Sequence, residues 1–303
     1  MRNRKKKLFK RIVSCNVQGL NGEAKQRLLA DDFFDNKFTF MMVQETKIQK
    51  NTQQTIESSC GKKLILYNSG HKSKSMKGVG FLVQENMKIN FQAVCERICL
   101  AEIKIDNLKV FAISAYAPTE DETSKHPEET ELFYNKLTTV VNKLSKRYTL
   151  IIGGDFNART KLSDPAEQKQ YSKVLGKYAR NQANKNGKLL IEFCKMHNLQ
   201  LVNTFFRHKP SQQITWEPAA KPSNNRRNPY RFQIDYIAIR KNQGVKVYDA
   251  RSYNIMRINC PGGHKDFCSY NWQSLLKSSK IRLCYVADFQ HMFWQLMLLH
   301  SNI

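Results

Sequence analysis

Runs of apolar residues alternate with short polar segments along most of the chain, and the clearest run covers residues 151–157. Two isoleucines and two glycines lead there into Asp155, Phe156 and Asn157. The glycines permit a tight turn or the close approach of a ligand. In an extended chain Asp155 and Asn157 would point the same way. The pattern predicts a buried strand whose tip carries either a binding site or only an Asx-type turn.

Further apolar runs end in polar residues in the same way. They are residues 11–19 with Asn16, residues 38–45 with Glu45, and residues 111–118 with Tyr116. A polar residue at a strand end is more often a solvated edge residue, but several such ends in one chain favour a shared site. Asp235 differs because it lies inside an apolar run, where a buried carboxylate is costly unless it is paired.

Helical spacing of apolar residues predicts three helices, at 23–36, 128–147 and 184–198. Further strands are predicted at 62–67, 78–84, 98–116, 199–202, 214–216 and 232–239. Residues 158–188 are polar and basic, which predicts a long surface loop. No linker divides the chain. We expect a basic arm over residues 1–11, one domain over residues 12–268 and an irregular tail over residues 269–303.

The charge of the chain adds a polyanionic partner to this picture. The 303 residues include 50 Lys and Arg against 25 Asp and Glu, giving a net charge of +25 and a pI near 9.8. Generic solubility needs far less charge. Nucleic acid is therefore the first candidate partner and an anionic membrane surface the second. The basic residues of the arm predict either a nuclear-localisation or nucleic-acid-binding segment, or only a solvated terminus.

Cysteine usage and the lengths of the apolar segments predict an intracellular protein. Eight cysteines are scattered without a C-x-x-C pattern, which favours reduced thiols. The basic N-terminus lacks the apolar run of a secretory leader. The most apolar stretch, residues 289–299, is shorter than the ~18 residues of a membrane span. We expect a nuclear protein with DNA as its partner, without a membrane anchor and without an evident obligate protein partner.

The polar strand ends, taken together, resemble the endonuclease/exonuclease/phosphatase superfamily, in particular the endonuclease domains of LINE-type non-LTR retrotransposons. Six pieces stand in the family's order over roughly residues 10–260. They are Ser14-Cys15-Asn16, Gln44-Glu45-Thr46, Tyr116-Ala117-Pro118, Gly154-Asp155-Phe156-Asn157, Thr215-Trp216 and Ile234-Asp235-Tyr236. The resemblance implies an α/β fold in four αββα layers, with two packed, mostly antiparallel β-sheets flanked by helices.

The resemblance also implies a divalent-metal phosphodiesterase that nicks DNA. Glu45, with Asn16 beside it, would hold Mg²⁺ or, in its place, Mn²⁺. Asp155 would orient and deprotonate the attacking water. Asn157 and Tyr116 would hold the scissile phosphate. Asp235 would pair with His264, which would also contact the phosphate.

One departure from the family bears on activity. The family closes with Ser-Asp-His on a final strand, whereas this chain reads Gly262-Gly263-His264, and Asp266 is the nearest substitute for the missing aspartate. The departure predicts reduced or lost activity. Two alternatives therefore stay open. One is a non-catalytic nucleic-acid-binding remnant, and the other is a phosphatase of the same superfamily, against which the charge of +25 counts.

Overall fold

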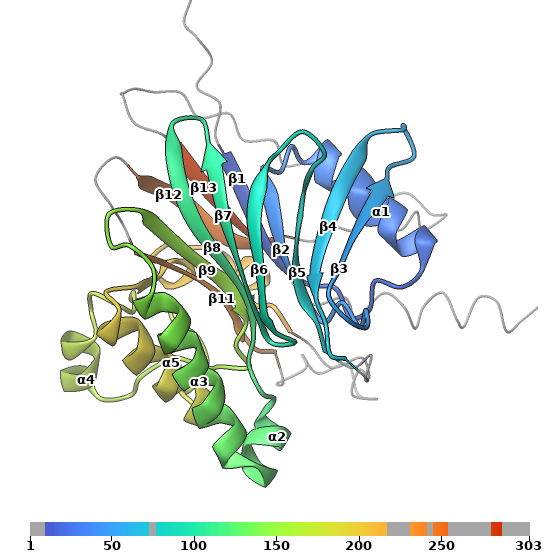
Figure 1. Ribbon diagram of the computed structural model, residues 1–303. Helices are drawn as coiled ribbons and strands as arrows, with labels where there is room; N and C mark the ends of the chain where they lie inside the picture. Colours follow the sequence, from blue (N-terminus) through green and yellow to red (C-terminus); the bar gives the residue numbers. More distant parts are fainter. Residues whose placement is uncertain (1–9, 73–76, 217–230, 241–244, 254–279, 287–303) are drawn as a thin grey trace, which may run out of the picture.

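The computed structural model describes residues 10–72, 77–216, 231–240, 245–253 and 280–286. Two β-sheets pack face to face in this part of the chain, and helices cover their outer faces (Figure 1). Most of the strand pairs are antiparallel. The predicted four-layer αββα fold is confirmed.

The seven-stranded sheet has the order β12-β13-β1-β2-β5-β4-β3. Its strands β12, β13, β1 and β2 run parallel to one another, and the pairs from β2 to β3 are antiparallel. The parallel pair β1 and β2 is buried along almost its whole length, as expected for strands covered on both faces. The strand bounds are Lys10–Asn16 (β1), Phe40–Gln44 (β2), Thr52–Glu57 (β3), Lys63–Ser69 (β4), Val79–Gln84 (β5), Lys246–Tyr253 (β12) and Lys280–Val286 (β13).

The six-stranded sheet has the order β10-β11-β9-β8-β7-β6, and β8 and β9 form its parallel pair. All seven residues of β9 are buried. The bounds are Ile89–Cys95 (β6), Ile98–Ile105 (β7), Leu108–Tyr116 (β8), Thr149–Asp155 (β9), Gln200–Leu201 (β10) and Asp235–Arg240 (β11).

The helices lie on opposite outer faces. Helix α1 lies beside the seven-stranded sheet, whereas α3 and α5 lie beside the six-stranded sheet (Figure 1). Phe33 of α1 packs in a cluster with residues of β1, β2, β4 and β5, and Phe133 and Leu190 pack in another with residues of β8 and β9. The helix bounds are Glu23–Asp35 (α1), Glu120–Lys125 (α2), Pro127–Asn142 (α3), Pro165–Gln170 (α4) and Lys185–Met196 (α5), with 3₁₀ turns at Val202–Thr204 (η1) and Pro210–Gln212 (η2).

A third apolar cluster fills the space between the sheets. Phe40 and Met42 of β2 meet Ala112 of β8 and Ile151 of β9 there. Gly153 of β9 makes the contact close, because a Cβ at this position would lie 2.3 Å from the Met42 Cε atom. The glycine therefore lets β9 approach β2, and this approach brings the ends of both strands together.

The sequence prediction differs from the structure mainly at the sheet edges. The strands β3 and β6 were not predicted, because their half-exposed, polar-rich sequences lack a clear apolar run. The predicted strand region 98–116 is the β7–β8 hairpin. The predicted loop 158–188 contains the short helix α4, which begins at its N-cap Asp164 and Pro165.

The prediction of an irregular tail over residues 269–303 was wrong for Lys280–Val286. These residues form β13, which pairs in parallel with both β1 and β12. The strand is therefore a central member of the seven-stranded sheet, although its neighbours in sequence gave no apolar pattern. No helix in the described part of the chain is long and apolar enough to cross a membrane.

Candidate active site

The carboxyl ends of β1 and β2 meet at one edge of the seven-stranded sheet. The two strands are parallel, and Asn16, the last residue of β1, lies opposite Gln44, the last residue of β2. Glu45 follows directly. The Asn16 Nδ2 atom donates a hydrogen bond to the Glu45 Oε1 atom at 2.8 Å. Parallel pairing therefore brings an amide and a carboxylate from separate motifs into contact.

The same amide also reaches the other sheet. Asn16 Nδ2 donates to the Oδ2 atom of Asp155, the last residue of β9, at 3.0 Å. Asp155 lies opposite Tyr116 in the parallel β8–β9 pair and opposite Asp235 in the antiparallel β9–β11 pair. The structure thus brings together residues that lie more than 130 positions apart in the sequence. The expected gathering of strand ends at one place is what the fold produces.

Glu45 has a left-handed backbone conformation, with φ of 51°. For a residue with a Cβ atom this conformation costs roughly 1–2 kcal/mol. Hydrogen bonds fix it from both sides, because the Gly19 N–H donates to the Glu45 carbonyl at 2.6 Å and the Thr46 N–H donates to the Gly78 carbonyl at 3.1 Å. Such local strain is common at functional sites. Here it occurs at the residue whose carboxylate accepts the hydrogen bond from Asn16.

Glu45 also has a basic neighbour. The Lys47 Nζ atom lies 3.5 Å from the Glu45 Oε2 atom. The Lys47 side chain is 39% exposed and the Glu45 side chain 17% exposed, so water screens the pair and its contribution to stability is small. Lys47 is two residues away on the same loop, and a stronger ligand for Glu45 can displace it.

Asp155 accepts hydrogen bonds on both of its oxygens. Oδ1 accepts from the Asn157 N–H at 3.0 Å, and Oδ2 accepts from Asn16. The first bond is that of an Asx-type turn, so the turn and the cluster occur together. Asp155 is only 4% exposed. Burial and the charge of Glu45 raise the pKa of Asp155 to about 7, although both hydrogen bonds and Arg97 oppose the increase.

Asn157 does not continue the extended strand, contrary to the interpretation that it points the same way as Asp155 in extended chain. Its φ is 47°, and the strand ends two residues earlier. The Asn157 Nδ2 atom donates to the Ala117 carbonyl at 3.0 Å, and the Asn157 carbonyl accepts from the Asn184 Nδ2 atom at 3.0 Å. Asparagine tolerates the left-handed conformation. The turn therefore places Asn157 beside Asp155 by curvature and not by strand alternation.

Tyr116 stands at the end of β8 and is 7% exposed. Burial, the negative charges of Glu45 and Asp155, and a side-chain hydrogen bond with Glu45 raise the Tyr116 pKa well above its ordinary value. The phenol therefore stays protonated at neutral pH and remains a hydrogen-bond donor.

Arg97 lies beside this cluster, although it was not among the residues predicted from the sequence. The side chain is 6% exposed, and its Nη1 atom donates to the Tyr116 carbonyl at 3.3 Å. The guanidinium carbon lies 5.3 Å from the centre of the Tyr116 ring. Its Nη2 atom donates to the Glu122 Oε1 atom at 2.8 Å, and Glu122 completes the capping box of α2 with Thr119. The turn sequence around Arg97 resembles an ordinary polar turn, so only the fold reveals these partners.

A buried polar network joins the two sheets beneath the cluster. The Gln44 Nε2 atom donates to the Ser114 hydroxyl at 2.9 Å, and that hydroxyl donates to the Val43 carbonyl at 2.8 Å. The Ser14 hydroxyl donates to the Gln44 Oε1 atom at 3.3 Å. Polar residues inside the apolar runs of β1, β2 and β8 were the available signal. The network fixes the residue before Glu45 against the opposite sheet.

Asp235 begins β11 and is 3% exposed. The preceding segment is fastened to the Thr215-Trp216 motif, where the Thr215 Oγ1 atom accepts from the Ile234 N–H at 3.0 Å. His264 lies outside the described residues, as do Gly262-Gly263 and Asp266. The pairing of Asp235 with His264 therefore stays a prediction.

The donor atoms of the cluster fit a hard divalent cation. Glu45 and Asp155 supply carboxylate oxygens, a ligand type that Mg²⁺ prefers. Asn16 turns its Nδ2 atom toward both carboxylates, and its Oδ1 atom accepts from the Gln18 N–H at 3.1 Å, so its amide would have to rotate to offer an oxygen to the cation. Burial, with a smaller contribution from the charge of Glu45, raises the pKa of Asp155, and a cation beside the carboxylate would favour its ionised form. Among the described residues no group of three or more His, Cys, Asp or Glu side chains is close enough to hold a metal, so water would have to complete the coordination.

Part of the chain matches a known family, and other proteins share its fold. Residues 110–223, which include most of β8 and all of β9 with Asp155 and Asn157, match the model of the Endonuclease-reverse transcriptase family. The catalytic domain of Xenopus laevis APE2 is 16% identical with a TM-score of 0.51, over 75% of this chain and 81% of that chain. The AP endonuclease LMAP from Leishmania major is 11% identical with a TM-score of 0.50, over 76% and 78%.

The endonuclease domain of TRAS1, a telomere-specific non-LTR retrotransposon, is 13% identical with a TM-score of 0.47, over 75% of this chain and 83% of that chain. No curated protein matches this chain in sequence. At these identities the two structures with TM-scores of 0.51 and 0.50 show the fold alone, and the chemistry has to be argued from the residues of this chain.

Proposed function

We propose that the chain is a member of the endonuclease/exonuclease/phosphatase superfamily and acts as a metal-dependent phosphodiester hydrolase that nicks DNA. The family match over residues 110–223 and the shared fold support this proposal. One observation carries the proposal: a single amide, that of Asn16, bonds two carboxylates that come from different sheets. A purely structural role for such a cluster is poorly favoured, because burial makes the ionised form of Asp155 costly and raises its pKa to about 7.

Glu45 and Asn16 are the residues that would hold the cation, with Asp155 beside them. When bound, Mg²⁺ would neutralise charge on the phosphate oxygens and lower the repulsion of an attacking hydroxide. Glu45 is the more exposed of the two carboxylates, so it is the one that an ion from solution can reach. Lys47 would then give up its contact with Glu45.

Asp155 is suited to accept the proton of the attacking water. In this step the water oxygen forms a bond to phosphorus and its proton moves to the Asp155 carboxylate. The bond between phosphorus and the leaving oxygen breaks, and that oxygen takes a proton from solvent water. A base works best when its pKa is near the working pH, and burial raises the pKa of Asp155 to about 7. The Asn157 N–H keeps the carboxylate oriented through the turn hydrogen bond.

Tyr116 and Asn157 would donate hydrogen bonds to the phosphate. Tyr116 remains protonated because its pKa is raised. Asn157 uses one of its two amide N–H groups for the Ala117 carbonyl and has a second available. Donors directed at developing negative charge contribute on the order of 3 kcal/mol each in other enzymes.

The choice of DNA as substrate rests on charge. A net charge of +25 attracts a polyanion, and its affinity would fall steeply with added salt. The seven basic residues of the N-terminal arm support the further proposal that the protein works in the nucleus.

Nicking of supercoiled plasmid tests the function. Wild-type protein is compared with Glu45→Gln in Mg²⁺ and in EDTA, and Glu57→Gln on the exposed face of β3 serves as the matched control. We expect Mg²⁺-dependent nicking by wild type and Glu57→Gln and none by Glu45→Gln. DNA binding without nicking would contradict the hydrolase proposal and support a non-catalytic nucleic-acid-binding remnant. Activity on a phosphomonoester but not on DNA would support a phosphatase instead.

A further inference from the structure

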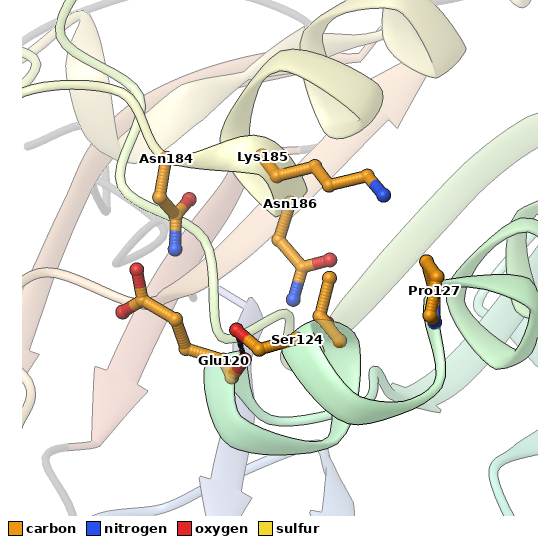
Figure 2. A pocket seen from close by; sticks show the side chains of 7 residues that line it. Glu120, Ser124, Pro127, Asn184, Lys185 and Asn186 are labelled. Atoms are coloured by element: carbon orange, nitrogen blue, oxygen red, sulfur yellow. Dashed lines mark hydrogen bonds between the residues drawn. The ribbon is translucent and has the colours of Figure 1, made fainter.

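A hollow of about 420 Å³ lies between α2 and the first turn of α5. Figure 2 shows Lys185 and Asn186 of α5 across from Ser124 and Pro127. The hollow adjoins the catalytic turn, because Asn184 and Asn186 on its wall both donate to the Asn157 carbonyl, at 3.0 and 3.5 Å. Its volume is within the range of sites for small organic groups.

Asn186 presents a fixed acceptor in this wall. Its Nδ2 atom donates to the Pro118 carbonyl at 2.8 Å as well as to the Asn157 carbonyl. A flipped amide would place its oxygen against these two carbonyl oxygens, so the orientation is determined by the contacts. The residue is 1% exposed, and its Oδ1 atom has no hydrogen-bond partner among the described residues. A buried acceptor without a partner lowers the stability of the folded state.

In the view of Figure 2 the Asn186 oxygen points toward the Pro127 side of the hollow and away from Asn184. A ligand N–H that enters from that side would supply the missing hydrogen bond. Unsatisfied buried acceptors call for such an explanation.

The rim of the hollow favours an anionic group. Lys185 is exposed and is the cation among the lining residues. It stands in the first turn of the 12-residue helix α5, whose N-terminus carries a partial positive charge. The carboxylate of Glu120 is offset by Arg159, whose Nη2 atom lies 2.8 Å from it. The occupant should therefore combine an N–H donor with a negative charge.

We propose that this hollow is a subsite for one nucleotide of the DNA strand next to the scissile phosphate. The exocyclic amino group of its base, as in adenine, donates to the Asn186 Oδ1 atom, and its phosphate lies near Lys185. Adenine carries such a donor at N6. The subsite rests on the proposed function, because it supposes that a DNA strand passes over Asn157. It would give the protein a preference for an amino-bearing base at one flanking position.

Binding in EDTA tests the subsite without any turnover. Fluorescence anisotropy compares oligothymidylates that contain either one adenine or one purine, the analogue that lacks the 6-amino group. We expect the adenine strand to bind about tenfold more tightly, since one buried acceptor gains its partner. Ser124→Trp, which fills the hollow from its exposed rim, should abolish this difference. Lys185→Ala should weaken both strands, whereas Lys188→Ala on the same helix should not.

Equal affinity for the adenine and purine strands in wild type would overturn the subsite. So would an undiminished difference in Ser124→Trp, provided that its thermal unfolding matches wild type. The plasmid assay separates the two proposals. Nicking without discrimination removes the subsite and leaves the hydrolase, whereas discrimination without nicking leaves the subsite and removes the hydrolase.

Discussion

The strands β2 and β9 are similar in composition and burial, but the carboxylates at their ends differ in exposure. Both strands are apolar and fully buried, and each pairs in parallel with a neighbour. At the end of β2, Glu45 itself has a left-handed backbone conformation. At the end of β9, the left-handed residue is Asn157, two residues after Asp155. Glu45 lies one residue beyond its strand, with 17% of the side chain exposed, whereas Asp155 is the last strand residue and is 4% exposed.

One residue of displacement along the chain therefore separates two environments. Beyond the strand, Glu45 stands beside the screened ammonium group of Lys47 and is open to an ion from solution. Inside the strand, Asp155 is buried and its pKa is raised to about 7. Two carboxylates that share one amide can thus divide the work of holding a cation and accepting a proton.

The largest expected effect comes from removing the buried base. Asp155→Asn keeps the size of the side chain but loses the proton acceptor, so we expect kcat for nicking to fall by about 10²–10⁴-fold. KM for DNA should change little. Steady-state nicking kinetics measure both constants. Asp106→Asn, in the exposed β7–β8 turn at φ of 53°, is the matched control. An Asp155→Asn protein with wild-type kcat would contradict the role of Asp155 as the proton acceptor.

A pH effect on stability should come from the same residue. The pKa of Asp155 is raised from 3.8 to about 7 by folding, so the folded metal-free protein binds this proton more tightly than the unfolded chain. Its contribution is fully present below about pH 4 and is lost as the pH rises through about 7. We expect the free energy of unfolding in EDTA to decline by a few kcal/mol over this range.

Urea unfolding between pH 4.5 and 8 measures this slope. In the Asp155→Asn variant the free energy of unfolding should depend much less on pH. In the wild-type protein, Mg²⁺ at pH 8 should restore the stability that is lost in EDTA. The same slope in both proteins would show that burial of Asp155 does not set its protonation.

A smaller effect should follow from loosening Arg97. Lysine cannot contact the Tyr116 carbonyl and Glu122 with one planar fork, so Arg97→Lys should displace Tyr116. We expect kcat to fall about tenfold with KM nearly unchanged, since the residue acts through Tyr116 and does not bind the strand. Arg27→Lys on the exposed side of α1 is the control. A lower melting temperature with unchanged kcat would make Arg97 a structural residue only.

The smallest expected effect concerns the network that supports the tip of β2. Ser114→Ala removes the partner of the Gln44 Nε2 atom and of the Val43 carbonyl. We expect a loss of about 1 kcal/mol in unfolding free energy, together with a modest rise in the Mg²⁺ concentration needed for half-maximal nicking. Ser172→Ala at an exposed hydroxyl should change neither quantity. An unchanged unfolding curve for Ser114→Ala would contradict the supporting role.

The sequence selected four polar residues that the structure brings together, but it did not select the residues that support them. Asn16, Glu45, Tyr116 and Asp155 could be selected because each follows an apolar run, and such runs end at the same edge when strands are parallel. Arg97 could not be selected, because its role depends on contacts with the Tyr116 ring and the Glu122 carboxylate, which lie later in the chain. Sequence spacing does not encode contacts of this kind.

The same limit applied to the fold. Long apolar strands such as β9 were predicted, whereas β3 and β6 were not, because edge strands are only half buried and tolerate polar residues. The strand β13 was missed although it pairs with β1. Its place in the sheet is set by two partners from distant parts of the chain, and the sequence around it gave no independent sign.

The central claim is that one divalent ion lies between the tips of β2 and β9, and anomalous scattering from Mn²⁺ in crystals of the protein tests it most directly. We predict one Mn²⁺ in contact with a Glu45 carboxylate oxygen, with Asn16 and Asp155 beside it and the Lys47 ammonium group displaced. Crystals in which Lys47 keeps its contact with Glu45, and the Mn²⁺ signal lies elsewhere or is missing, would contradict the account.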